Sequence, residues 1–265
     1  MADTAELQFE LQMPELQTFK PQSGDGAIAG RVDPFAGVDH EADEVSREIY
    51  FISGLGADWR VFHRLQLKGY RPVYIRWERP CRSESIEHYA KRLLAQVKTE
   101  HPILVGLSFG GLMAIEMAKF CDPAQIIVIS SAVSEAQVPN YYKLFRWLPL
   151  QLVVPFKRLL WAVYGLMQWL FGLDDPEDSS LFKQVLMDTD PFFLKWAINR
   201  VVSWRNQTVP ENLVQIHGGR DRVFPFGHRS ADVVVPEGGH LMVLNRAEEL
   251  SRLLMTTLDT SPAQT

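Results

Sequence analysis

Three polar residues that lie far apart in this chain of 265 residues could together activate a hydroxyl group: Ser108, Asp221 and His240. A serine hydroxyl is a weak nucleophile at neutral pH, so it needs a base that removes its proton. Histidine suits that task near pH 7, and a carboxylate bound to its second ring nitrogen fixes its tautomer. The three side chains would then act as nucleophile, base and orienting acid.

Ser108 belongs to the pentapeptide Gly106-Leu107-Ser108-Phe109-Gly110. The apolar residues 103–105 before it are typical of a buried strand, and residues 111–120 after it are typical of a helix. A G-x-S-x-G sequence in that context predicts a sharp turn that lifts the serine above the edge of a sheet. The pattern alone would occur by chance in about one chain in ten of this length, so the argument also depends on residues elsewhere.

The base and the acid are predicted from their positions after strands. His240 follows the apolar run 233–235 and a Gly-Gly pair, and Asp221 follows the apolar run 213–216. Because the carboxyl ends of parallel strands meet at one edge of a sheet, both side chains are expected near the serine. Histidine occurs seven times in the chain, and His228 is the alternative base. The alternative acids are Asp188, Asp190 and Glu237. None of these alternatives lies as well in a loop after a predicted strand.

Acyl chemistry also requires hydrogen-bond donors for the oxyanion that forms when the serine attacks. One expected donor is the backbone N–H of Phe109, which follows the serine at the start of a helix. The second is expected in the glycine-rich loop 53–58, and we favour the N–H of Leu55 because glycines let the backbone approach a ligand closely. The alternative is that this loop is an ordinary turn.

The elements that position these residues alternate between strands and helices, which favours an α/β fold with a mostly parallel, doubly wound sheet. The predicted strands are short and apolar on both faces: 49–52, 72–75, 103–106, 126–129, 213–216 and 232–235. An amphipathic helix is predicted from Ile86 to Val97. The last helix is predicted to begin at Asn245, with Glu248 completing a capping box.

The interval between Ile129 and Leu213 breaks this alternation. It contains no convincing strand, and an unstructured loop of that length is implausible. We therefore expect a helical cap at 134–208, inserted into a core made of residues 46–133 and 209–260. Residues 1–45 are expected to form a loosely attached extension, with a short strand near residues 7–11, and residues 261–265 a tail. The many aromatic residues of the cap either pack it together, line an apolar pocket above Ser108, or touch a membrane surface.

Composition excludes several classes of function. The net charge of −5 argues against a nucleic-acid partner. Two cysteines, Cys81 and Cys121, without a C-x-x-C spacing favour a reduced protein. The N-terminus lacks the pattern of a signal peptide, so a cytoplasmic location is expected. Charges and prolines interrupt the apolar segment 144–173, which does not resemble a transmembrane span. The sequence implies no cofactor and no metal.

Four motifs in order make the chain resemble the α/β-hydrolase family: residues 51–58, 106–111, 216–221 and 238–240. The resemblance covers residues 48–258 and implies a triad of Ser108, Asp221 and His240, in the order that this fold uses. It also implies an oxyanion hole from Leu55 and Phe109, and a cap. The chain departs from the family pattern in two ways. Ser53 replaces a histidine common in the oxyanion loop, and the two leading antiparallel strands are not evident in residues 1–45.

The leading hypothesis is a serine hydrolase that cleaves a carboxylic ester or related acyl bond (EC 3.1.1), and the expected partner is an apolar small-molecule acyl substrate. A serine nucleophile argues against the dehalogenase and epoxide-hydrolase branches, which use an aspartate at that position. Because a fold does not determine a reaction, two alternatives stay open. The same triad could serve a C–C hydrolase or lyase, or the chain could be a ligand-binding receptor with little turnover.

Overall fold

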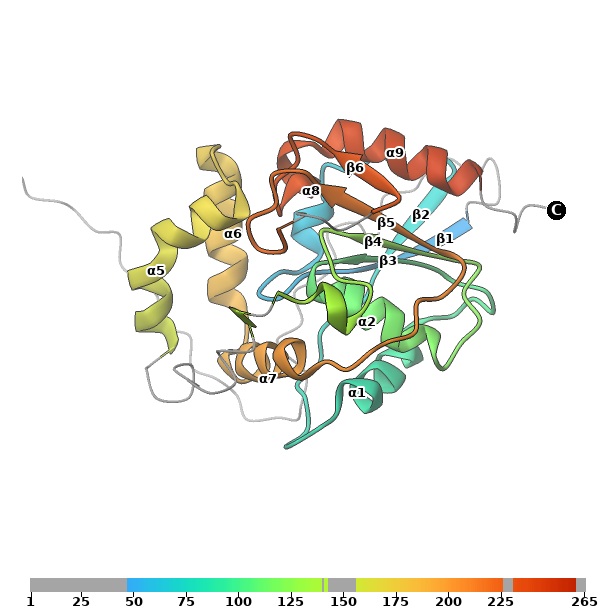
Figure 1. Ribbon diagram of the computed structural model, residues 1–265, viewed down its shortest axis with the longest axis horizontal. Coiled ribbons are helices and arrows are strands. Elements are labelled where there is room, and N and C mark those ends of the chain that lie inside the picture. The colour runs from blue at the N-terminus through green and yellow to red at the C-terminus, as the bar shows by residue number, and fades with distance from the viewer. Residues whose placement is uncertain (1–46, 140, 143–155, 226–230, 261–265) are drawn as a thin grey trace, which may run out of the picture.

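In the computed structural model, the centre of the molecule is one sheet of six strands (Figure 1). The structure describes residues 47–139, 141–142, 156–225 and 231–260. The strands are β1 (Arg47–Ile52), β2 (Tyr70–Tyr74), β3 (Ile103–Leu107), β4 (Gln125–Ile129), β5 (Leu213–Gly218) and β6 (Val233–Val235). Their order is β2-β1-β3-β4-β5-β6, and every pair is parallel. The predicted fold class is confirmed.

Helices cover both faces of the sheet because its strands bury alternate side chains on opposite sides. On one face, Phe51, Val105 and Ile127 pack against a 3₁₀ turn, η1 (Trp59–Phe62), and against α8 (Met242–Asn245) and α9 (Ala247–Asp259). On the other face, the neighbouring residues of the same strands pack against α1 (Ile86–Leu93) and α2 (Phe109–Ala118). Figure 1 shows α9 above the sheet and α1 and α2 below it.

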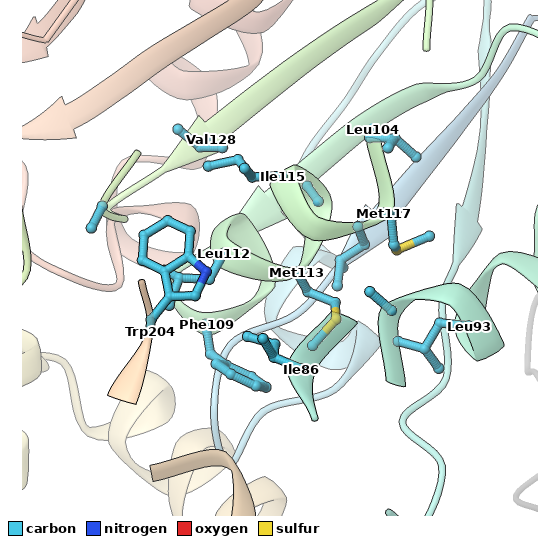
Figure 2. Packing of buried hydrophobic residues seen from close by; sticks show 14 of the residues in the cluster. Ile86, Leu93, Leu104, Phe109, Leu112, Met113, Ile115, Met117, Val128 and Trp204 are labelled. Atoms are coloured by element: carbon cyan, nitrogen blue, oxygen red, sulfur yellow. The ribbon is translucent and has the colours of Figure 1, made fainter. Parts of the chain in front are cut away.

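Helix α2 carries the most deeply buried surface near the predicted nucleophile. Every residue from Phe109 to Met117 is buried, because α2 lies between the sheet and α1. Figure 2 shows Met113 and Met117 close to Ile86 and Leu93 of α1, and Ile115 beside Val128 of β4. Helix α2 therefore provides a rigid support for the turn at its N-terminus.

In the part of the interval between β4 and β5 that the structure describes lie a short 3₁₀ turn, η3 (Glu135–Gln137), and the longer helices α5 (Phe156–Phe171), α6 (Pro176–Asp188) and α7 (Pro191–Ser203). We call α5–α7 the insert. Helices α6 and α7 begin with a proline after an aspartate that accepts hydrogen bonds from the next backbone N–H groups. In the described part of this interval, no residue belongs to a strand. Figure 1 shows α5 and α6 beyond one end of the sheet.

The start of the last helix differs from the prediction. Helix α9 begins at Ala247, its N-cap residue is Arg246, and no side chain caps it. The capping box expected from Asn245 and Glu248 is therefore wrong. The reason is tertiary: Asn245 ends the short helix α8, and its Nδ2 donates to the carbonyl of Gly172 at 2.9 Å.

Several predictions concern residues outside the described ranges: the extension 1–45 with its expected strand at 7–11, the tail 261–265 and the alternative base His228. Within the described ranges, none of the helices has the length and apolar character needed to cross a bilayer.

Candidate active site

The turn between β3 and α2 holds Ser108 in an uncommon backbone conformation, with φ 52° and ψ −117°. Glycines make the turn possible. A Cβ at Gly106 would collide with the backbone of Gly110, and a Cβ at Gly110 would collide with the carbonyls of Ile52 and Ser53. The Ser108 N–H donates to the Ile129 carbonyl at 2.9 Å. Such strained residues persist where surrounding contacts fix them, and they occur frequently in active sites.

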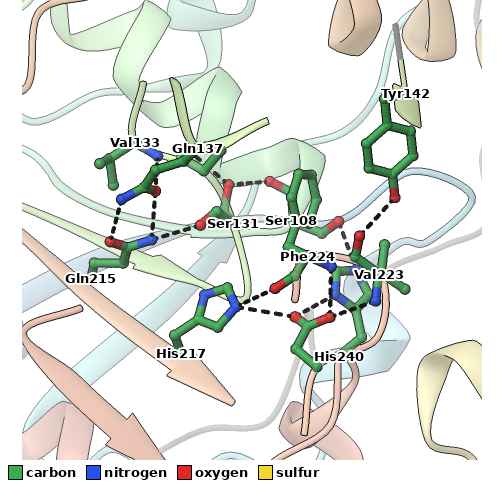
Figure 3. A network of polar contacts seen from close by, with 12 residues as sticks. Ser108, Ser131, Val133, Gln137, Tyr142, Gln215, His217, Val223, Phe224 and His240 are labelled. Carbon is green, nitrogen blue, oxygen red and sulfur yellow. Dashed lines mark hydrogen bonds and ion pairs between the residues drawn. The ribbon is translucent and has the colours of Figure 1, made fainter. Parts of the chain in front are cut away.

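The three residues singled out in the sequence form one hydrogen-bonded chain. His240 Nε2 lies 2.9 Å from Ser108 Oγ, and His240 Nδ1 lies 2.9 Å from Asp221 Oδ2. Because a carboxylate only accepts, Nδ1 carries the proton and Nε2 is left to accept from the serine hydroxyl. All three residues are buried, with 9% of Ser108, 4% of Asp221 and 1% of His240 exposed. Figure 3 shows His240 among these contacts.

The Asp221 carboxylate is held by the turn that follows it. Its Oδ1 accepts from the backbone N–H groups of Val223 and Phe224, both at 2.8 Å, which leaves Oδ2 for His240. The His240 imidazole contacts two aromatic rings, with centroid distances of 5.2 Å to Phe171 of α5 and 5.9 Å to Phe224. The geometry can therefore move a proton from the serine to the imidazole in a site shielded from water.

The insert contacts this turn directly. Arg222 donates to the Trp169 carbonyl at 2.6 Å, and its guanidinium lies 4.6 Å from the centre of the Trp169 ring. The hydroxyls of Tyr141 and Tyr142 both donate to the Val223 carbonyl, at 3.1 and 3.0 Å. Burial raises the pKa of Tyr142, so its hydroxyl remains a donor at neutral pH. These contacts link the insert and the residues before it to the acid.

The loop after β1 lies beside the serine, as the prediction for the second oxyanion donor requires. A Cβ at Gly54 would lie 3.4 Å from Ser108 Cβ. Ser53 Oγ donates to the Ala57 carbonyl at 2.8 Å, so this serine closes the loop. Phe109 begins α2, where a backbone N–H has no partner within its helix. The roles of Leu55 and Phe109 as donors stay predictions.

Three polar residues near the site were not predicted from the sequence: His217, Ser131 and Gln215. His217, at the end of β5, is buried, and its Nε2 lies 2.8 Å from the Phe224 carbonyl. Ser131 donates to the Ser108 carbonyl at 2.7 Å, and Gln215 donates to the Ser131 carbonyl at 2.8 Å (Figure 3). The only signal for His217 was its place four residues before Asp221.

The alternative acids are engaged elsewhere. Asp188 binds Arg60 at 2.9 Å, Asp190 caps α7, and Glu237 pairs with Arg220 at 2.7 Å. Across the described residues, no cluster of three or more His, Cys, Asp or Glu side chains could hold a metal ion.

A cavity of about 450 Å³ lies beside the loop after β1. Ser53 and Ala57 line it together with residues of β2, Trp77 from the segment after β2, and residues of the insert that include Phe193. Trp77 also contacts the Phe109 ring, with 5.4 Å between centroids.

The parallel sheet, the serine turn and the strand-end loops define an α/β hydrolase, and the sequence comparison agrees. The chain belongs to the alpha/beta hydrolase family, whose model matches residues 49–253. Comparison with curated protein sequences gave no match.

Solved structures share the fold at low sequence identity. A thermophilic esterase from Thermogutta terrifontis is 15% identical with a TM-score of 0.62, over 84% of this chain and 92% of that one. A bromoperoxidase from Bacillus anthracis is 14% identical with a TM-score of 0.59, over 82% and 93%. An epoxide hydrolase from Bacillus megaterium is 12% identical with a TM-score of 0.59, over 82% and 95%. Proteins of this fold thus differ in their reactions, and the likeness shows the fold alone.

Proposed function

We propose that this protein is a serine hydrolase that cleaves a carboxylic ester or related acyl bond. The observation that carries the proposal is the hydrogen-bonded chain from Ser108 Oγ through His240 to Asp221, with 2.9 Å at each step. A buried base that accepts from a serine hydroxyl is the arrangement that acyl transfer needs.

The reaction proceeds in two stages. In the first, Ser108 Oγ attacks the carbonyl carbon while its proton passes to His240 Nε2. The oxyanion is stabilised by the N–H groups of Phe109 and Leu55, and the ester C–O bond breaks as His240 protonates the leaving alcohol. In the second, a water molecule gives a proton to His240 and attacks the acyl carbon, and the bond from that carbon to Ser108 Oγ breaks as His240 returns the proton to Oγ. Asp221 stays ionised throughout and stabilises the imidazolium.

The substrate in this proposal is an apolar small-molecule acyl compound. Support comes from the aromatic rings around the base, Phe171 and Phe224, and from the near-complete burial of Ser108. A charged acyl group would be left without a partner among these rings.

The test is hydrolysis of p-nitrophenyl esters of increasing acyl length by the wild type, S108A and S180A. Ser180 is an exposed serine on α6, so S180A is a matched control. We expect S108A to lower kcat by about 10,000-fold or more, because the nucleophile is lost, and S180A to behave as the wild type. Absence of hydrolysis by the wild type would overturn the proposal in favour of C–C bond cleavage or ligand binding, and equal rates in S108A would overturn it by showing that Ser108 is not the nucleophile.

A further inference from the structure

A second histidine approaches the carboxylate of Asp221. His217 Nε2 lies 2.8 Å from the Phe224 carbonyl oxygen and 3.6 Å from Asp221 Oδ2, the oxygen that also binds His240. The His217 side chain comes from β5 and is 5% exposed. Figure 3 shows its imidazole directed at the turn 221–224, on the side away from Tyr142.

The contacts fix the position of one proton on His217. Both neighbours of Nε2, a carbonyl and a carboxylate, only accept hydrogen bonds, so Nε2 carries the hydrogen. A neutral imidazole with hydrogen on Nε2 donates to the carbonyl and turns the same N–H dipole toward the carboxylate. Besides His217, the titratable side chains that the described contacts place in or against this turn are Asp221, His240, Tyr141 and Tyr142, and Arg222 extends from it toward α5.

His217 provides the second of two hydrogen bonds that hold the backbone of Phe224. The Phe224 N–H donates to Asp221 Oδ1 at 2.8 Å, and the Phe224 carbonyl accepts from His217. Phe224 is therefore held from both sides, and its ring lies against the His240 imidazole. Without the His217 donor, the backbone of the turn could rotate about Phe224. Asp221 Oδ2 would then no longer be aligned with His240 Nδ1.

An apolar side chain of similar size would fill the space at the end of β5 without the cost of burying an imidazole. What it could not provide is a donor for the Phe224 carbonyl. The Nε2–H group of His217 thus serves to hold the turn that carries Asp221, and packing of the core does not require it.

We propose that His217 is a positioning residue for the acid–base pair: it holds the turn 221–224 so that the Asp221 carboxylate stays aligned with His240. The inference rests on the proposed function of the triad. It adds a fourth side chain, one that does not touch the substrate and acts through Asp221.

The test compares H217L with H217Q. Leucine keeps the bulk and removes the donor, whereas the glutamine amide can donate to the same carbonyl. We expect H217L to lower kcat about tenfold or more with KM changed less than about twofold, because a misaligned catalytic group slows the chemical step. The acidic midpoint of the pH–rate profile should move to lower pH in H217L, because the imidazolium of His240 loses part of its carboxylate partner. H217Q should stay within about threefold of the wild type.

A second measurement does not depend on turnover. The proton between His240 Nδ1 and Asp221 should give a far-downfield ¹H NMR signal in the wild type and in H217Q. We expect this signal to broaden or vanish in H217L, and to be absent in H240Q, which identifies it. Thermal unfolding of each variant shows whether it is folded.

Wild-type kcat, pH profile and downfield signal in folded H217L would overturn the positioning role. An equal loss of kcat in H217Q and H217L would also overturn it, because the donor would then not matter. If H217L does not fold, H217N, whose shorter amide does not reach the carbonyl, replaces it in the same comparison. A wild type that hydrolyses no ester would instead contradict the proposed function, while the NMR comparison would still decide the role of His217.

Discussion

Gly110 lies where the serine turn touches the loop after β1. A Cβ on this residue would overlap the carbonyl oxygens of Ile52 and Ser53. Those two residues lead into the loop that contains Leu55, so crowding at Gly110 would push the predicted oxyanion donor away from Ser108. At the scale of single residues, the site depends as much on the missing side chain of Gly110 as on the side chains that react.

We therefore expect G110A to impair both stability and catalysis. The overlap involves backbone atoms, which cannot move aside cheaply, so the free energy of unfolding should fall by about 1–3 kcal/mol or more. The value of kcat should fall by about 100-fold, the cost of displacing a catalytic group by about 1 Å. Denaturant unfolding and ester hydrolysis measure the two effects.

The control is G165A, in the helix α5, where a Cβ would meet no atom within 4 Å. It should leave kcat unchanged and stabilise the helix by up to about 1 kcal/mol. Equal behaviour of G110A and G165A would show that space at Gly110 does not matter.

At the scale of elements, Glu84 joins α1 to the insert. Its carboxylate is almost fully buried and accepts from the Cys81 N–H at 2.7 Å and from Arg92 at 3.0 Å. Its carbonyl accepts from Trp196 Nε1 of α7 at 2.8 Å. Burial raises the pKa of Glu84, but the hydrogen bonds from Arg92, from the Cys81 N–H and from His88 outweigh it, so the pKa is lowered overall. The ionised form is thus the one that the folded state favours.

This pKa shift predicts how the stability changes with pH. Because the pKa of Glu84 is lower in the folded state, its contribution is present above the unfolded pKa of about 4.3 and is lost as the pH falls through the folded pKa. E84Q should therefore cost about 1–3 kcal/mol at pH 7, and the difference from the wild type should shrink below about pH 4. Denaturant unfolding at several pH values measures it.

E211Q, which changes an exposed glutamate in a turn, serves as the control and should shift stability by less than about 0.5 kcal/mol. A cost for E84Q that stays constant from pH 7 to pH 3 would show that the carboxylate charge has no part in holding α1 and α7 together.

At the scale of the whole molecule, the parallel sheet explains why residues distant in sequence meet. Every described strand pair is parallel, so the loops after β1, β3, β5 and β6 leave the sheet at one edge. Apolar runs followed by Gly, Ser, Asp or His were enough to predict this convergence, which is why Ser108, Asp221 and His240 could be chosen from the sequence.

What could not be predicted depends on contacts between elements. The start of α9 follows from the hydrogen bond between the Asn245 side chain and the Gly172 carbonyl. The contact between the Phe171 and His240 rings follows from the position of Phe171 at the end of α5. His217 lies just after the predicted strand 213–216, and its role could not be predicted because it arises from a carbonyl seven positions later. The packing of the insert involves many similar aromatic and aliphatic side chains, whose pairing no local pattern specifies.

The most direct test of the central claim is covalent trapping of Ser108 with a fluorophosphonate, followed by mass spectrometry of the intact chain and its peptides. We predict one adduct per chain, on the peptide that contains Ser108, with no adduct in S108A and labelling slowed at least about 100-fold in H240Q, because the serine loses its base. An adduct elsewhere with Ser108 unmodified, or labelling of Ser108 in H240Q as fast as in the wild type, would contradict the account.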